Sequence, residues 1–201
     1  MLLVLYPDAT EQTGEALLAR LREAGLEGHP VADQPRRVIR LHGVPVLGLC
    51  LGMQAMALAA VRSLPGNGDA TLGEIEPEAK AQVFTRLTDG AGLPVDRLGD
   101  RMVRLCGKSG LGTRLERHGL ETTWIERMNH RYRLDPGYEA VLQRARYRVA
   151  ARDPGAGVVD VIEGCGAFCA ASSGHPELTS REGRPHPLMV AFLRARRSAP
   201  D

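Results

Sequence analysis

The chain has 201 residues, a formal net charge of +2 at pH 7, and 43% hydrophobic and 25% charged residues, values that are ordinary for a globular protein. The length allows one sizeable hydrophobic core, the small net charge gives no reason to expect a nucleic-acid partner, and no apolar run approaches the ~18 residues of a transmembrane helix, so we expect no membrane partner. The N-terminus enters a strand-like segment without a basic region or a cleavage site, which indicates a cytoplasmic protein.

Strand-like and helix-like segments alternate along the chain. Strands are predicted at residues 2–6, 44–47, 101–105, 122–126, 147–152, 158–163 and 167–171. Helices are predicted at residues 11–24, 36–42, 53–62 and 188–196, whereas residues 79–87 fit either element. This alternation predicts an α/β fold, a three-layer sandwich around a largely parallel central sheet. Because the chain has neither an internal repeat nor a dividing linker, we expect residues 1–201 to form a single domain.

The cysteines and the glycine-rich segment give no sign of a bound group. Cys50, Cys106, Cys165 and Cys169 do not have the spacing of a disulfide framework. Cys165 and Cys169 have a Cys-x₃-Cys spacing, but no second pair of metal ligands follows them. Residues 107–112 lack the order of glycines, lysine and hydroxyl residue that a phosphate-binding loop requires. We therefore predict no metal and no cofactor.

Residues 48–54 place a cysteine at the junction of a predicted strand and a predicted helix. Cys50 has Gly48 two residues before it and Gly52 two residues after it. Hydrolases carry their nucleophile on such a strand–turn–helix elbow, where glycines avoid collisions with a side chain. We expect the helix N-terminus to lower the pKa of the Cys50 thiol and the N–H of Leu51 to donate to an oxyanion. The alternative is a buried structural cysteine.

His175 and Glu177 supply the two other groups that a cysteine nucleophile needs. A histidine can take the thiol proton, and a carboxylate can orient the imidazole and stabilise its charged form. Residues i and i+2 of an extended segment point to the same face, so these two side chains can meet. The order Cys50, His175, Glu177 predicts a Cys-His-Glu triad, although the pair taken alone also fits a loop histidine beside a surface glutamate.

With this elbow and triad, the sequence resembles the class I glutamine amidotransferases, which take ammonia from glutamine. Within them it is most similar to the C-terminal glutaminase domain of CTP synthase. The similarity extends over about residues 36–196 in several blocks that occur in the right order: 47–54, 70–74, 125–132 and 175–193. The resemblance implies a flavodoxin-like, class I glutamine amidotransferase-like fold that is shortened in its N-terminal part.

The resemblance also implies how the substrate would be held. The residues concerned are Gly48, Gly52 and Gln54 in the elbow, Glu74, which would hold the amino group, and Arg127, Asn129 and His130 in an Arg/His-rich segment.

The sequence departs from the family pattern in three places. Residues 22–30 lack the Gly-Gly pair of the loop that supplies a second oxyanion donor. Met128 and Asn129 stand where the family usually has histidine and arginine. Residues 170–174 carry small side chains where the family has a glutamine and an aromatic residue, a change that would open the pocket to other substrates.

These features leave three hypotheses. The first is hydrolysis of glutamine, or of a related amide, through a thioester on Cys50, with the ammonia passed to a separate synthetase subunit. The second keeps the triad and changes the substrate to another amide or to a biosynthetic acyl group. The third is a degenerate domain that binds a ligand or has a regulatory role without catalysis. A homodimer is left open as an assembly state.

Overall fold

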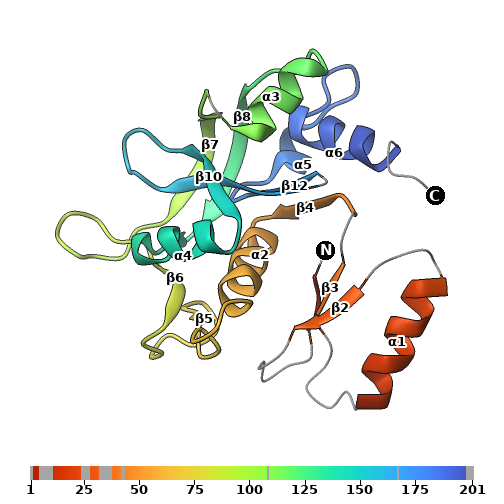
Figure 1. The fold of residues 1–201 in the computed structure, drawn as a ribbon. Coiled ribbons are helices and arrows are strands. Elements are labelled where there is room, and N and C mark those ends of the chain that lie inside the picture. Colours follow the sequence, from red (N-terminus) through yellow and green to blue (C-terminus); the bar gives the residue numbers. More distant parts are fainter. Residues whose placement is uncertain are drawn as a thin grey trace.

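The computed structural model describes most of the chain (Figure 1): residues 2–4, 11–23, 28–31, 38–41, 44–107, 109–166 and 168–197. The helices are α1 (Glu11–Glu23), α2 (Leu51–Arg62), α3 (Gly110–Arg117), α4 (Glu139–Arg144), α5 (Pro176–Thr179) and α6 (Pro187–Arg197), with a 3₁₀ turn at Pro136–Tyr138. The strands are β1 (Leu2–Val4), β2 (Gly28–Val31), β3 (Val38–Leu41), β4 (Val46–Leu49), β5 (Thr71–Leu72), β6 (Gln82–Arg86), β7 (Arg97–Arg104), β8 (Thr123–His130), β9 (Tyr132–Leu134), β10 (Tyr147–Arg152), β11 (Val159–Gly164) and β12 (Cys169–Ser172).

The central sheet has four strands in the order β10-β11-β12-β4. Strands β10, β11 and β12 follow one another through short connections and pair antiparallel, whereas β4 comes from much earlier in the chain and pairs parallel with β12. The register of the parallel pair places Ser172 beside Leu49. The carboxyl ends of β4 and β12 therefore lie at the same edge of the sheet, and the residues that follow each strand emerge next to each other.

The two faces of this sheet belong to different hydrophobic cores. On β12, Ala171 packs in a core with α2 and α4, whereas its neighbour Ala170 packs in a core with α3 and α6. On β11, Ile162 and Val161 divide between the same two cores. This is the alternation expected of a strand that is buried on both faces. Figure 1 shows α2 and α4 on one side of the sheet and α3 and α6 on the other.

Helix α2 follows β4 with only Cys50 between them. Its residues form a helix because the apolar side chains recur at helical spacing. Met53, Met56, Ala57 and Ala60 are buried and recur at i, i+3, i+4 and i+7, so they form one face of the helix. The N–H of Ser63 bonds to the carbonyl of Ala59, which closes the last turn. Burial of this face fixes the helix against the sheet and leaves its N-terminus at the sheet edge.

The remaining strands form three smaller sheets. β1, β3 and β2 pair antiparallel in that order, and β6 lies between β5 and β9 in another sheet. β7 and β8 form a two-stranded antiparallel ribbon. None of the helices in the described part of the chain has the length and apolar character needed to cross a membrane.

The predicted α/β class and three-layer arrangement are confirmed, but some elements differ. The helix predicted at 36–42 is wrong: β3 lies there, and its β-branched residues Val38 and Ile39 favour a strand that pairs with β1 and β2. Among the described strands, only β4–β12 and β5–β6 are parallel, so the largely parallel pairing that we expect is not found in them. Residues 5–6, 24, 36–37, 42 and 167 of the predicted elements lie outside the described residues.

Candidate active site

Cys50 occupies a strained backbone position between β4 and α2. Its φ of 51° and ψ of −110° are unusual for a residue with a side chain, and such a conformation costs ~1–3 kcal/mol. The N–H of Cys50 donates to the carbonyl of Ser172 at 2.9 Å, which ties the strained residue to the end of β12. The predicted strand–turn–helix elbow is therefore present, with Cys50 at its corner.

The two glycines of the elbow have different surroundings. A Cβ on Gly48 would lie 2.6 Å from Sδ of Met56 and 2.8 Å from the carbonyl oxygen of Gly52, so no side chain fits there. A Cβ on Gly52 would meet nothing within 4 Å. The expectation that glycine avoids a collision is confirmed for Gly48 and wrong for Gly52, which faces open space two residues after Cys50.

The pKa of the Cys50 thiol is raised from its ordinary value, contrary to the expectation from the helix N-terminus. Burial is the largest cause, because it disfavours the thiolate. A backbone hydrogen bond from Leu51 acts in the opposite direction, and the negative charges of Glu74 and Glu177 raise the pKa further. The thiol is therefore protonated at neutral pH and needs a base before it can act as a nucleophile.

His175 and Glu177 form the predicted pair. Nδ1 of His175 lies 2.7 Å from Oε1 of Glu177, and both side chains are partly exposed. The N–H of His175 donates to the carbonyl of Arg127 at 2.8 Å, so β8 fixes its backbone. Because His175 follows β12 and Cys50 follows β4, the parallel register brings both residues to the same sheet edge.

Gln54 and Glu74 are also brought together. Nε2 of buried Gln54, on the first turns of α2, donates to Oε2 of exposed Glu74 at 3.1 Å. Oε1 of Gln54 is buried and has no hydrogen-bond partner. Because the charge of Glu74 raises the pKa of the Cys50 thiol, this carboxylate lies within electrostatic reach of that sulfur.

Strand alternation separates the three residues predicted on β8. Arg127 and Asn129 are exposed on one face of the strand, and Arg127 pairs with Asp100 of β7 at 2.7 Å. His130 is buried on the opposite face, where its Nδ1 lies 3.0 Å from the carbonyl of Tyr132. Burial lowers the pKa of His130. His130 therefore does not share a surface with Arg127 and Asn129.

A buried ionic network next to residues 172–173 is not predicted by the sequence. Arg97 of β7 forms ion pairs with Asp160 and Asp153, and its guanidinium lies 3.2 Å from Nε2 of His130. Burial raises the pKa of Asp160, and the Arg97 guanidinium opposes this shift. The N–H of Ser173 donates to the carbonyl of Asp160 at 2.8 Å. The signal in the sequence was Asp160 itself, the single charged residue among the valines and isoleucine at 158–162.

Residues 172–174 do not open the pocket. All three are buried, and a Cβ on Gly174 would lie 2.8 Å from Cγ of Glu126 and 2.9 Å from Sδ of Met128. The small residues at this position instead allow β8 to approach the end of β12 closely. The expectation that they widen the substrate site is wrong. Of residues 22–30, which lack the family's Gly-Gly pair, 24–27 lie outside the described residues.

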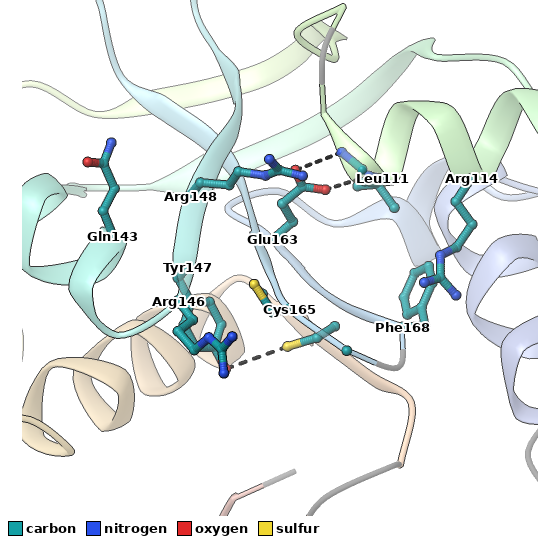
Figure 2. A pocket seen from close by; sticks show the side chains of 13 residues that line it. Leu111, Arg114, Gln143, Arg146, Tyr147, Arg148, Glu163, Cys165 and Phe168 are labelled. Carbon is teal, nitrogen blue, oxygen red and sulfur yellow. Dashed lines mark hydrogen bonds and ion pairs between the residues drawn. The ribbon is translucent and has the colours of Figure 1, made fainter.

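A separate cavity of about 520 Å³ lies by the N-terminus of α3 (Figure 2). Glu163 accepts hydrogen bonds from the N–H groups of Gly110 and Leu111 and pairs with Arg148, so a carboxylate occupies the position that a phosphate would take. Cys165 and Cys169 both line this cavity. Within the described residues, no three His, Cys, Asp or Glu side chains cluster as metal ligands would.

The fold and this geometry define a class of protein: an α/β protein with a cysteine at a strand–turn–helix elbow and a histidine–carboxylate pair at the same sheet edge. The family model for glutamine amidotransferase class-I matches residues 27–195. The chain therefore belongs to the class I glutamine amidotransferase family.

Curated relatives place the similarity within this family. CTP synthase from Saccharopolyspora erythraea is 33% identical over 170 residues, which are 79% of this chain and 29% of that protein. CTP synthase from Deinococcus radiodurans is 34% identical over 185 residues, 85% of this chain and 32% of that protein. The chain thus spans less than a third of the length of these relatives. Among solved structures, the glutaminase domain of Trypanosoma brucei CTPS with bound acivicin superimposes with a TM-score of 0.67 at 26% identity, covering 79% of this chain and 62% of that chain.

Proposed function

We propose that the chain hydrolyses the side-chain amide of glutamine, or of a closely related compound, with Cys50 as nucleophile and His175 and Glu177 as its partners. The observation that carries the proposal is the strained Cys50 elbow at the sheet edge from which the hydrogen-bonded His175–Glu177 pair also emerges. Membership of the glutamine amidotransferase family and similarity to a glutaminase domain support glutamine as the substrate class.

The first step is removal of the thiol proton. Because burial raises the pKa of the Cys50 thiol, the nucleophile depends on a base. Glu177 engages Nδ1 of His175, so Nε2 takes the proton and the carboxylate stabilises the resulting imidazolium. The thiolate then attacks the amide carbon, a C–S bond forms, and the carbonyl oxygen becomes an oxyanion. The N–H of Leu51 is one donor to this oxyanion.

The second half of the reaction releases the two products. The oxyanion re-forms its carbonyl, the C–N bond breaks, and His175 gives its proton to the leaving nitrogen, so ammonia departs and a thioester remains on Cys50. His175 then takes a proton from water, and the resulting hydroxide attacks the thioester carbon. The C–S bond breaks, the acid is released, and Cys50 recovers its proton.

Glu74 and the outer face of β8 are the proposed contacts for the ends of the substrate. An ionised carboxylate only accepts hydrogen bonds, which suits Glu74 to the α-ammonium group of an amino acid. Gln54 holds that carboxylate at 3.1 Å, and a Cβ position at Gly52, two residues before Gln54, has nothing within 4 Å. Arg127 and Asn129 can meet a substrate carboxylate if Arg127 exchanges its ion pair with Asp100. Direct contact between His130 and the substrate would require the side chain of His130 to move to the opposite face of β8.

We propose that the ammonia passes to a separate synthetase domain or subunit. The curated relatives are CTP synthases, and the matched part is less than a third of their length. A second substrate class, another small amide, is favoured by Asn129, which stands where the family usually has an arginine. An amide without a carboxylate end would not need that arginine.

The test is release of ammonia and of glutamate from glutamine, measured in parallel with asparagine and simple primary amides. We expect release from glutamine by the wild type and loss of it to background in Cys50→Ala. The matched control is Cys165→Ser, because Cys165 is exposed and lines the separate cavity. Full activity of Cys50→Ala would overturn the proposal. Activity on another amide alone would favour the second substrate class, and no activity on any amide would favour a non-catalytic domain.

A further inference from the structure

Glu126 is a fully buried carboxyl group that lies against residues 172–174, the segment that leads from the end of β12 to His175. It lies on the inward face of β8 with an exposed fraction of 0%. Its Oε2 accepts a hydrogen bond from Nε1 of Trp124 at 2.9 Å, whereas its Oε1 has no hydrogen-bond partner. A buried carboxyl with one unpartnered oxygen is costly, so it calls for an explanation.

The carboxyl lies against Gly174 of segment 172–174. The space where a Cβ of Gly174 would lie is 2.8 Å from Cγ of Glu126 and 2.9 Å from its Cδ. The Ser172 hydroxyl lies close enough to affect the carboxyl's pKa, and it bonds to the carbonyl of Asp160 at 3.4 Å. The carbonyl of Ser172 holds the N–H of Cys50, and Gly174 precedes His175. Glu126 therefore lies against the segment that hydrogen-bonds to Cys50 and leads into His175.

The charge state of Glu126 changes near neutral pH. Burial raises its pKa to about 7, and the negative charges of Asp160 on β11 and Glu177 on α5 act in the same direction. The Trp124 indole and the Ser172 hydroxyl lower the pKa, but by less. A charged Oε1 would draw the Ser172 hydroxyl away from the Asp160 carbonyl, because the hydroxyl is the nearby donor that can turn.

Two other charged or titratable residues adjoin Glu126 in the strand register or adjoin its partner Trp124. Arg101 of β7 is directly opposite Glu126 in the strand register, but its side chain is exposed. His186 packs edge-on against Trp124 with ring centroids 5.2 Å apart, and burial lowers its pKa to about 4. The titration of His186 is therefore well separated from that of Glu126.

We propose that Glu126 is a positioning residue for Cys50 and His175: its neutral carboxyl, held by the Trp124 indole, supports segment 172–174, and loss of its proton displaces that segment. The catalytic meaning of this role rests on the proposed function. The positioning itself is measurable without glutamine, because the reactivity of the Cys50 thiol and the fluorescence of Trp124 both report it.

The first readout is the fluorescence of Trp124, the single tryptophan of the chain, measured between pH 5 and 9. The wild type is expected to show a transition centred near pH 7, since the indole N–H donates to the titrating carboxyl. Glu126→Gln keeps the shape and an oxygen for the indole but cannot ionise, so the transition is expected to disappear. Ser172→Ala removes a donor that favours the charged carboxyl, so it is expected to move the midpoint to higher pH.

The second readout is the rate at which iodoacetamide alkylates Cys50, followed by peptide mass spectrometry so that the other cysteines do not interfere. At pH 5.5 the wild type and Glu126→Gln are expected to react at similar rates. At pH 8.5 the variant is expected to react roughly threefold faster or more, because the charged carboxyl is present in the wild type alone. A merely structural glutamate would leave the two pH profiles parallel.

The outcomes separate this proposal from the proposed function. A pH-dependent ratio of alkylation rates together with loss of the fluorescence transition supports the positioning role, even if no glutamine is hydrolysed. Parallel pH profiles and an unchanged fluorescence transition in Glu126→Gln overturn it, even if glutamine is hydrolysed. Should Glu126→Gln fail to fold, Ser172→Ala decides: an unmoved fluorescence midpoint overturns the proposal.

Discussion

The carbonyl of Ser172 accepts a hydrogen bond from the N–H of Cys50 at 2.9 Å, and this bond joins the two strands that carry the site. It continues the parallel pairing of β12 with β4 by one residue beyond the Ser172–Leu49 pair. Three residues after Ser172 the chain reaches His175. The backbone register of a sheet edge, rather than a surface loop, therefore sets where the proposed nucleophile and base lie relative to each other.

Loss of the proposed base is the first prediction. His175→Ala is expected to lower kcat for glutamine hydrolysis by roughly 10²–10⁴-fold, the usual contribution of a positioned general acid–base. Glu177→Gln is expected to lose less, because an amide still contacts Nδ1. The measurement is steady-state kcat and KM, with the exposed His118→Ala as the control. A kcat for His175→Ala within a few-fold of wild type would contradict the triad.

Alanine at the two elbow glycines should differ in its effect on stability. Gly48→Ala places a Cβ 2.8 Å from a backbone oxygen, so we expect a loss of ~1–3 kcal/mol in the free energy of unfolding. Gly52→Ala meets nothing within 4 Å and lies in the first turn of α2, where alanine is the better helix former. We expect it to keep its stability but to bind glutamine more weakly. Urea denaturation and KM measure the two effects, and equal loss of stability in both variants would contradict this packing.

The buried carboxyl of Glu126 should make the protein less stable as pH rises. Its pKa is raised from 4.5 to about 7 in the folded state, so the folded state binds more protons than the unfolded state between these values. The contribution of this group is fully present below about pH 4.5 and is lost as pH rises through about 7. The difference of ~2.5 between the pKa values of the folded and unfolded states corresponds to about 3 kcal/mol in the free energy of unfolding.

This predicted loss of stability should disappear in Glu126→Gln, which cannot ionise. The free energy of unfolding in urea, measured at pH 5 and at pH 8, is expected to fall more steeply for the wild type than for the variant. A gap between the two proteins that stays constant across this range would show that Glu126 does not change its charge there.

Two ion pairs that involve residues of the β7–β8 ribbon, one of them with Asp160 of β11, should differ strongly in their contribution to stability. Arg97 and Asp160 have side-chain exposures of 8% and 1%, whereas Arg127 and Asp100 have 50% and 51%. Asp160→Asn leaves a buried guanidinium with less compensation, so we expect a loss of ~3–5 kcal/mol. Asp100→Asn in the exposed pair is expected to cost ~0–1 kcal/mol. Urea denaturation compares them, and a similar cost for both would contradict the buried network.

Local patterns predicted the elbow and the histidine–glutamate pair, because each depends on neighbouring residues. Gly48, Cys50 and the apolar run after them fix a strand, a tight turn and a helix within a few residues. His175 and Glu177 are two residues apart and meet through their own backbone. The family blocks also pointed correctly to the class I amidotransferase fold, which the family model confirms.

Long-range pairing explains what the sequence did not reveal. The pKa of Cys50 depends on its burial by distant elements, which outweighs the local effect of the helix N-terminus. The side chains of His130 and Arg127 lie on opposite faces because β8 continues past the predicted end at residue 126 as far as His130. The pairing of Arg97 with Asp160 joins residues 63 positions apart, so no local pattern reports it.

The most direct test of the central claim is reaction with a chloroketone or diazoketone analogue of glutamine, followed by peptide mass spectrometry. We predict a single adduct on Cys50 whose formation is slowed by added glutamine, with no adduct in His175→Ala on the same timescale. Labelling of Cys106 or Cys165 instead, or labelling of Cys50 that glutamine does not slow, would contradict a glutamine-binding nucleophile at this sheet edge.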